Sequence, residues 1–196
     1  MDKSLDGYEV LLCVSGGIAC YKAADLASKL VQAGAGVTVA MTPAAVEFVQ
    51  PLTFGSLTRR AVFTSMWQST ENHDSGHISL TERADLTILA PATANTIAKL
   101  AHGLADNLVS TMLLATAGSC DVLVAPAMNS RMFAHPAVQT NIETLASMPG
   151  VHLIGPAEGR LACGTTGPGR MCEPADILAR ATELLLRHAP KRLSGV

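Results

Sequence analysis

The chain has 196 residues, a formal charge of −2 at pH 7 and 15% charged residues, against about 25% in ordinary globular domains. Its length fits one domain with a sizeable core, and the lack of cationic excess argues against nucleic acid or an acidic membrane surface as a partner. Because the mean hydropathy is +0.30, we expect apolar surface to remain after one copy has folded, and hence a homo-oligomer.

The remaining bulk features set the expected environment of the protein. Its apolar runs have the length of strands and are too short to cross a bilayer, and the N-terminus lacks the apolar core of a signal peptide. Five cysteines form an odd set with neither a Cys-x-x-Cys pair nor histidines at zinc-site spacing. We therefore expect a cytoplasmic protein with no membrane segment, no disulfide framework and no metal site.

Strand-like and helix-like segments alternate along the chain, which predicts a parallel sheet covered by helices on both faces. The strand-like runs are residues 8–15, 36–42, 84–91, 120–127 and 151–156. The helix-like runs are residues 19–33, a segment near Ala44, and residues 93–101, 106–118, 136–147 and 175–187. The expected fold is a single-domain α/β, Rossmann-like (flavodoxin-like) doubly wound parallel sheet in three layers. It should cover residues 1–188 and leave a polar tail at 189–196.

Ligands of such folds bind at the carboxyl ends of the strands, and the first strand ends in SGGIACYK. Ser15, Gly16 and Gly17 let backbone N–H groups approach an anion at the start of a helix, which favours a phosphate. The Gly-x-Gly-x-x-Gly fingerprint is absent, and Met41 and Thr42 stand where a dinucleotide site needs an acid. A mononucleotide is therefore favoured over NAD, and the alternative is a tight turn without a ligand.

Two later strand ends are also polar. In PATANT, Thr93, Asn95 and Thr96 could cap a helix or could hydrogen-bond a ring edge or a ribityl chain. In PAMNSRM, Asn129 could hold a carboxylate or amide without bringing a charge into a dry site, or could form an Asx turn. Each stretch alone therefore leaves a ligand role and a local structural role open.

Two further segments could carry chemistry. His77 follows the polar stretch QSTENHDSG and could transfer protons near neutral pH, although a lone histidine can equally be structural. The segment LACGTTGPGRMCEP places Cys163 ahead of glycines 164, 167 and 169 and of Arg170. A backbone with three glycines can fold sharply or close over a ligand, and an ordinary surface loop is the alternative.

Taken together, these blocks resemble one family. SGGIACYK, GHISL with His77, PATANT and PAMNSRM occur in that order and are followed by ACGTTGPGRM. The ordered set resembles the homo-oligomeric flavin-containing cysteine decarboxylases over nearly the whole chain. The last block resembles the substrate-recognition clamp of the phosphopantothenoylcysteine decarboxylases, the coenzyme A branch of that family. The resemblance implies a Rossmann-like fold, FMN bound between subunits, and homotrimers that often assemble into dodecamers.

The resemblance also implies roles for individual residues. The FMN-binding positions would be Ser15, Gly16, Gly17, Ile18, Thr42, Thr93, Ala94, Asn95 and Thr96. The substrate-binding positions would be Ala127, Met128, Asn129, Ala162, Gly164, Arg170 and Met171. The catalytic positions would be His77 as the active-site histidine, Asn129 as the residue that grips the carboxylate and amide, and Cys163 as the acid of the clamp.

The implied activity is that of a carboxy-lyase that converts 4′-phosphopantothenoylcysteine to 4′-phosphopantetheine in coenzyme A biosynthesis. FMN would take two electrons from the CH2–SH unit, which lets the carboxyl depart, and would return them while Cys163 delivers a proton. Arg59, Arg60 and Arg170 are candidates for the substrate phosphate, although Arg59 and Arg60 could simply be solvated.

Alternatives to this activity remain. In most bacteria such a decarboxylase is fused to the synthetase that makes its substrate, and 196 residues leave no room for a synthetase. We therefore expect a separate phosphopantothenoylcysteine synthetase upstream, or a different substrate. The runner-up is decarboxylation of a peptide C-terminal cysteine. A catalytically silent, FMN-binding regulatory subunit is the alternative from another class.

Overall fold

A computed structural model describes residues 3–67, 76–160, 162, 164 and 166–191, with the side chains of residues 76 and 77 not described. Its centre is a parallel six-stranded sheet with the strand order β3-β2-β1-β4-β5-β6. The strands of this sheet are β1 (Glu9–Val14), β2 (Gly36–Met41), β3 (Val62–Phe63), β4 (Leu86–Ala92), β5 (Asp121–Pro126) and β6 (Val151–Leu153). Without the two-residue β3, the order has the flavodoxin-like pattern 2-1-3-4-5.

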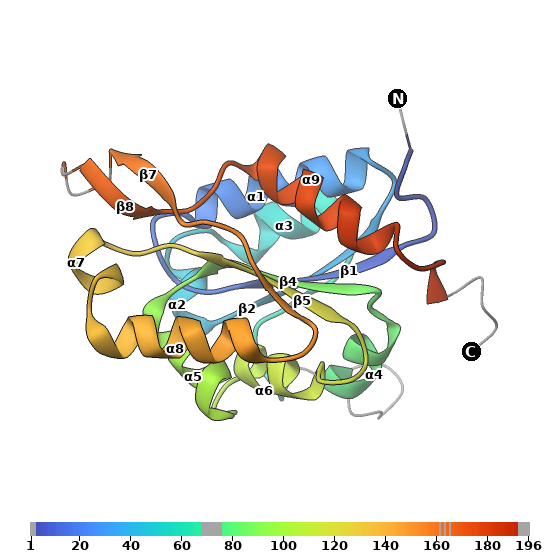
Figure 1. Ribbon diagram of the computed structural model, residues 1–196. Coiled ribbons are helices and arrows are strands. Elements are labelled where there is room, and N and C mark those ends of the chain that lie inside the picture. Colours follow the sequence, from blue (N-terminus) through green and yellow to red (C-terminus); the bar gives the residue numbers. More distant parts are fainter. Residues whose placement is uncertain (1–2, 68–75, 161, 163, 165, 192–196) are drawn as a thin grey trace.

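Helices cover both faces of the sheet and complete three layers (Figure 1). One layer contains α1 (Cys20–Gln32), α3 (Pro51–Thr58) and α9 (Pro174–Leu185). The other contains α4 (Gly76–Arg83), α5 (Ala94–His102), α6 (Leu108–Ala115) and α8 (Pro136–Ser147). The short helices α2 (Pro43–Val46) and α7 (Ser130–Phe133) follow β2 and β5 directly.

The central strands are apolar on both faces, as the sequence predicts for a doubly covered sheet. Every residue of β1 and of β4 is buried. Successive side chains of a strand point to opposite faces, so Leu12 and Val14 pack in one hydrophobic cluster, whereas Leu11 and Cys13 pack in the other. The two clusters are the cores beneath the two helical layers, and they make the sheet rigid enough to hold the turns at its edge.

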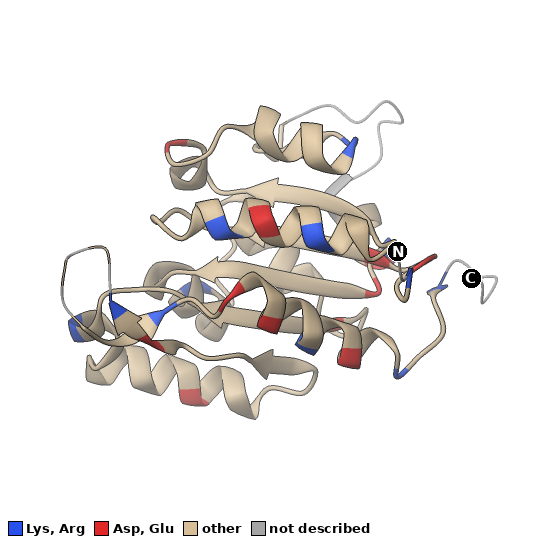
Figure 2. Ribbon diagram, turned by 90° about the horizontal axis from the view of Figure 1, so that it is seen from above, with Lys and Arg blue, Asp and Glu red and all other residues tan. Residues whose placement is uncertain are grey.

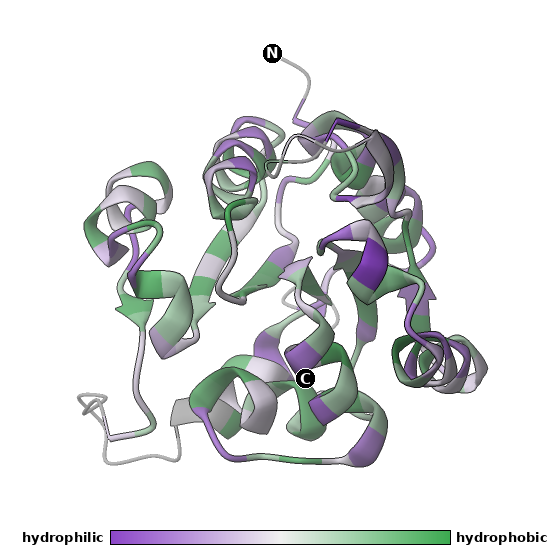
Figure 3. Ribbon diagram, turned by 90° about the vertical axis from the view of Figure 1, so that its left-hand side faces the viewer, coloured by the Kyte–Doolittle hydropathy of each residue, from purple (hydrophilic) through white to green (hydrophobic). Residues whose placement is uncertain are grey.

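The sheet changes direction between β1 and β4. The chain passes from β1 outward through β2 to one edge and from β4 through β5 to the other, so the connections after β1 and β4 diverge at their carboxyl ends. In open α/β sheets the crevice at such a switch point is the usual ligand site. This carboxyl edge is the left-hand side of Figure 1 and faces the viewer in Figure 3.

Several elements were not predicted from the sequence. α3, β3 and α4 lie in the stretch between residues 51 and 83, for which we expected no regular elements. Within the glycine-rich segment, Thr166–Arg170 form the strand β8, which pairs antiparallel in a hairpin with the preceding strand β7 (Ala157–Arg160), and neither strand was predicted. The hairpin projects from the carboxyl edge in Figure 1.

The start of the predicted tail is attached to the domain. The backbone N–H of Lys191 donates a 2.8 Å hydrogen bond to Asp85, and its Nζ donates to the carbonyl oxygens of Glu82 and Ala84 at 2.9 and 2.6 Å. Within the described residues, no helix combines the length and apolar character that a membrane span requires.

Candidate functional site

The turns after β1 and β4 are joined at the switch point by Ser15. Its hydroxyl donates a 2.6 Å hydrogen bond to the carbonyl oxygen of Pro91 and accepts one of 3.0 Å from the backbone N–H of Thr93. Ser15 is buried, with 1% of its surface exposed. The hydroxyl therefore fixes the two turns against each other, and the residues that follow it form the surface of the site.

The turn after Ser15 presents a row of backbone donors. Within the part of the chain that the structure describes, the N–H groups of Gly16, Gly17, Ile18 and Ala19 have no hydrogen-bond acceptor. Ala19, the N-cap of α1, offers no side-chain cap, so the positive end of this 13-residue helix is also uncompensated. Such a group of donors at a helix start is the usual binding arrangement for a phosphate.

The two glycines of this turn are needed for different reasons. A Cβ atom on Gly16 would lie 2.5 Å from the carbonyl carbon of Ala44, so Gly16 is required for packing against α2. A Cβ atom on Gly17 would meet only the Cγ2 of Thr93, at 3.7 Å, so the fold leaves room for a side chain there. The open space in front of Gly17 belongs to the cavity described below.

Two of the three threonines of the predicted site, Thr42 and Thr93, act as helix caps. Thr93 accepts a 3.4 Å hydrogen bond from the backbone N–H of Thr96, and their hydroxyls lie 3.1 Å apart. Thr42 is buried and caps α2 by accepting from the N–H of Ala45 at 3.2 Å. Asn95 is exposed on the first turn of α5.

The turn after β5 is held by Asn129 and by the hairpin. Asn129 caps α7, with its Oδ1 accepting a 2.8 Å hydrogen bond from the N–H of Arg131. The N–H of Met128 donates to the carbonyl oxygen of Gly169 at 2.8 Å. Because Gly169 has φ of +123° and a Cβ there would lie 2.3 Å from the Met128 carbonyl oxygen, only glycine allows this close contact.

These turns enclose a cavity of about 590 Å³, within the range of about 300–1,000 Å³ that small-molecule sites have. It lies between the start of α1, the turns after β4 and β5, and the hairpin. The cavity is lined by Gly16, Gly17, Ile18, Ala19, Tyr21, Lys22, Thr93, Ala94, Ala127, Met128, Asn129, Met132, Arg160, Ala162, Gly169, Arg170 and Met171.

Many of the residues singled out from the sequence therefore meet in one place, and several do not. Ser15, Thr42 and Thr96 are buried behind the lining, Asn95 is exposed, and Gly164 lies outside the lining. Cys163 lies outside the described residues. His77 belongs to the first turn of α4, but its side chain is not described.

Lys22 is the principal feature of this site that the sequence did not reveal. Only 5% of its surface is exposed, and its Nζ lies 3.0 Å from both the carbonyl oxygen of Met171 and the carboxylate of Glu173. Arg170 pairs with the same carboxylate. Hydrogen bonding to Lys22, its charge and that of Arg170 lower the pKa of Glu173, so this carboxylate stays ionised near neutral pH. The only hint in the sequence was the position of Lys22 on the first turn of α1.

Among the described residues, the two thiols near the cavity, Cys20 and Cys172, are not activated. Cys20 donates to the carbonyl oxygen of Ser15 at 3.3 Å, and burial raises the pKa of its thiol. Burial also raises the pKa of Cys172. Both groups stay protonated at neutral pH and do not supply a thiolate nucleophile.

Arg59 and Arg60, which we had considered for the substrate phosphate, lie away from the cavity. Arg60 pairs through both terminal nitrogens with the buried carboxylate of Glu9, at the amino end of β1. Arg59 is exposed at the C-terminal end of α3. The third candidate, Arg170, lines the cavity.

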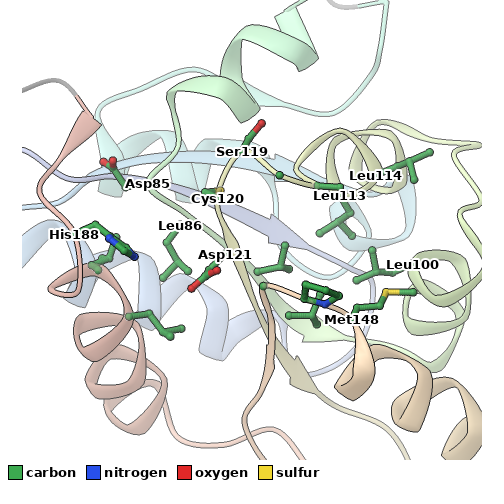
Figure 4. A pocket seen from close by; sticks show the side chains of 18 of the residues that line it. Asp85, Leu86, Leu100, Leu113, Leu114, Ser119, Cys120, Asp121, Met148 and His188 are labelled. Carbon is green, nitrogen blue, oxygen red and sulfur yellow. The ribbon is translucent and has the colours of Figure 1, made fainter. Parts of the chain in front are cut away.

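A larger cavity of about 750 Å³ opens at the opposite, amino edge of the sheet (Figure 4). Asp85, Asp121 and His188 lie on one side of it, and Leu100, Leu113, Leu114 and Met148 lie on the other. None of the predicted site residues lines it. The smaller cavity is therefore the candidate active site, because it contains the row of N–H groups without described acceptors and lies at the switch point.

Comparisons with known proteins show which family and which solved structures the chain resembles. The model of the family described as Flavoprotein matches residues 1–186. The bifunctional coenzyme A biosynthesis protein CoaBC of Bacillus subtilis is 49% identical over 97% of this chain and 46% of its own length. The chain thus spans about half the length of the first curated relatives that it matches.

Two further relatives match over nearly their full length. A probable phosphopantothenoylcysteine decarboxylase of Streptococcus mutans is 42% identical, over 90% of this chain and 98% of that protein. The solved structure of a PPC decarboxylase mutant complexed with pantothenoylaminoethenethiol superposes with a TM-score of 0.82 at 31% identity. That match covers 92% of this chain and 99% of the other.

Proposed function

The chain belongs to the Flavoprotein family, and from this premise we propose that it is an FMN-dependent carboxy-lyase of coenzyme A biosynthesis. Its reaction is decarboxylation of the cysteine moiety of 4′-phosphopantothenoylcysteine to 4′-phosphopantetheine. The name of the Streptococcus mutans relative and the similarity to the PPC decarboxylase structure support this assignment.

The observation that carries the proposal is the row of N–H groups from Gly16 to Ala19, without acceptors among the described residues, in a cavity at the switch point. This row fits one phosphate. The strand β2 ends without an acid that could bind a ribose, so a flavin mononucleotide suits the site better than a dinucleotide. Gly17 keeps open the space that a side chain would otherwise fill.

Two groups of residues hold FMN in this proposal. Ser15, Gly16, Gly17, Ile18 and Thr42 form the phosphate end, with Ser15 and Thr42 acting from behind the lining by fixing the turns. The residues along the flavin are Thr93, Ala94, Asn95 and Thr96. When bound, FMN supplies a reversible two-electron acceptor, which makes loss of the carboxyl group from a saturated cysteine side chain feasible.

The substrate lies against the turn after β5 and under the hairpin. Asn129 binds the carboxylate and the amide, positioned by its cap on α7, with Ala127 and Met128 beside it. Ala162, Gly164, Arg170 and Met171 form the clamp side, which excludes water from the reacting groups. His77 serves as base or electrostatic partner in the first half of the reaction, and Cys163 delivers the proton that completes the product.

We also propose that one flavoprotein domain spans residues 1–188, with a tail at 189–196, and that it forms homotrimers that can assemble into dodecamers. Large apolar side chains are exposed at several places, among them Tyr21 at 61%, Leu52 at 78% and Trp67 at 89%. Hydrophobic segments, shown in green, occur on several of the peripheral helices in Figure 3. Contact between copies would bury them and would shield the cavity, because Ile18 and Tyr21 line it.

The surroundings of the enzyme follow from its substrate. A phosphopantothenoylcysteine synthetase activity supplies the substrate of this reaction, and relatives such as CoaBC are bifunctional. The cysteines that the structure describes, Cys13, Cys20, Cys120 and Cys172, are free thiols, which suits the reducing cytoplasm.

The test is to incubate FMN-loaded protein with phosphopantothenoylcysteine and, separately, with a peptide that ends in cysteine, while carbon dioxide is followed. Release from phosphopantothenoylcysteine alone supports the proposal. Release from the peptide alone reassigns the substrate. Tight FMN binding without turnover of either compound favours a regulatory flavoprotein, and failure to bind FMN rejects the proposal.

A further inference from the structure

The candidate active site has an unusual balance of charge. Three cationic side chains line its cavity, namely Lys22, Arg160 and Arg170, and no described carboxylate does. Figure 2 shows Lys and Arg segments in blue around the hairpin at the left-hand side of the molecule. A cavity lined in this way attracts an anionic ligand.

Two of the three cations share the single carboxylate of Glu173. Lys22 contacts its carboxylate at 3.0 Å, and Arg170 pairs with it as well. Arg160 differs, because among the residues that the structure describes it has no carboxylate partner and no hydrogen bond from its guanidinium. Three cations and one carboxylate leave a positive excess at the cavity, and Arg160 is the cation that no described carboxylate contacts.

The position of Arg160 separates it from the row of N–H groups. It is the last residue of β7 and lies opposite Thr166 of β8, whereas the N–H groups belong to the turn between β1 and α1. The Nη1 of Arg170 lies 3.0 Å from the place that a Cβ on Gly159 would occupy, so the second guanidinium lies beside the residue preceding Arg160. The cavity therefore has two anion-binding regions, supplied by different elements.

We propose that Arg160 binds the terminal phosphate monoester of the substrate and so determines its preference for phosphorylated over unphosphorylated pantothenoyl compounds. The inference rests on the proposed function and adds the residue that binds this phosphate. A guanidinium can donate two parallel hydrogen bonds to a phosphate, and a charge without a competing carboxylate is free to do so. The phosphate of FMN is assigned to the row of N–H groups instead.

The test measures equilibrium binding to the FMN-loaded protein by calorimetry. The ligands are 4′-phosphopantothenate and pantothenate, which differ only in the phosphate. We expect Arg160→Gln to weaken binding of 4′-phosphopantothenate by about 10- to 100-fold and to leave pantothenate unchanged. Arg160→Lys should lose less affinity for 4′-phosphopantothenate, because lysine keeps the positive charge and loses only the two parallel donors of the guanidinium. Arg187→Gln removes the same charge from an exposed position outside the cavity lining and should behave as wild type.

Equal losses for both ligands, or no loss for either, would overturn the proposal. A parallel titration of the apoprotein with FMN and riboflavin identifies which phosphate Arg160 binds. If Arg160→Gln reduces the preference for FMN over riboflavin, the residue belongs to the cofactor and the proposal is wrong. The outcome is separable from that of the proposed function, because wild type could fail to release carbon dioxide and still show the Arg160-dependent difference in binding.

Discussion

A Cβ atom placed on Gly167 would lie 2.7 Å from the Oγ of Ser130, so the hairpin strand β8 lies directly over the first residue of α7. The same hydroxyl is buried and has no hydrogen-bond partner among the described residues. The contact joins the clamp side of the cavity to the turn that carries Asn129, although the two residues lie 37 positions apart in the sequence.

This contact predicts a rescue experiment. Gly167→Ala should lower the free energy of unfolding by about 1–3 kcal/mol through overpacking, whereas Ser130→Ala alone should be neutral or stabilising by about 1 kcal/mol, because it removes an unsatisfied hydroxyl. The double variant should recover most of the loss, since the closest remaining atom is the Cβ of residue 130 at 3.4 Å. Denaturant unfolding of the four proteins measures the coupling, and strict additivity would contradict the contact.

Gly16 and Gly17 should respond differently to the same substitution. Gly16→Ala should destabilise the protein by about 1–3 kcal/mol through its clash with Ala44. Gly17→Ala should change stability by less than about 0.5 kcal/mol but should weaken FMN binding at least about tenfold, since the added methyl enters the phosphate-binding turn. Thermal unfolding of the apoprotein and quenching of flavin fluorescence measure the two effects. Normal FMN affinity in Gly17→Ala would mean that this turn does not hold the phosphate.

The pair of Lys22 and Glu173 predicts a pH dependence. Because the folded-state pKa of Glu173 is lowered, its stabilisation is complete above the ordinary carboxyl pKa and disappears as the pH falls through the lowered value. Wild type should therefore unfold at a higher temperature than Glu173→Gln at pH 7. This difference in unfolding temperature should shrink below about pH 4. The corresponding difference in the free energy of unfolding should stay below about 1 kcal/mol, because the carboxylate of Glu173 is half exposed. A difference in unfolding temperature that grows as the pH falls would contradict a lowered pKa of Glu173.

We expect Arg60 to stabilise the fold and to have no role in binding FMN or substrate. Removing it leaves the carboxylate of Glu9, which is 7% exposed, without its main partner. We expect Arg60→Gln to lower the free energy of unfolding by about 3 kcal/mol and to leave FMN and substrate affinities of the folded protein unchanged. Arg59→Gln is the matched control and should lie within about 0.5 kcal/mol of wild type. If Arg60→Gln loses substrate affinity while its stability is unchanged, Arg60 has a role in the active site and the prediction is wrong.

The proposed role of Cys163 has a chemical signature. Cys163→Ser should still release carbon dioxide but should accumulate the unsaturated enethiol, because a serine hydroxyl is a much poorer proton donor than a thiol. Mass spectrometry of the products separates the two compounds by two mass units. A normal yield of the saturated aminoethanethiol product would exclude the residue as proton donor.

Much of the framework could be predicted from local patterns. The apolar runs of β1, β2, β4 and β5 and the small residues after β1 are properties of neighbouring residues. They predict a parallel sheet with a turn of small residues at its carboxyl edge. β3 and α3 were not predicted, because a two-residue strand and a helix with little segregation of polar from apolar residues carry no periodic signal. The β7–β8 hairpin was not predicted because its strands contain Gly and Pro, which are depleted in strands and typical of turns.

The sequence by itself determined the alternation of strands and helices, and it pointed to the carboxyl edge and to the residue types of the candidate site, because each depends on side chains close together along the chain. Only the tertiary structure decided which cations are free. Lys22 meets Glu173 across 151 residues, Arg60 meets Glu9 across 51, and Arg160 meets no described carboxylate. An ion pair depends on distance in space, which the spacing of two charges in a sequence does not specify.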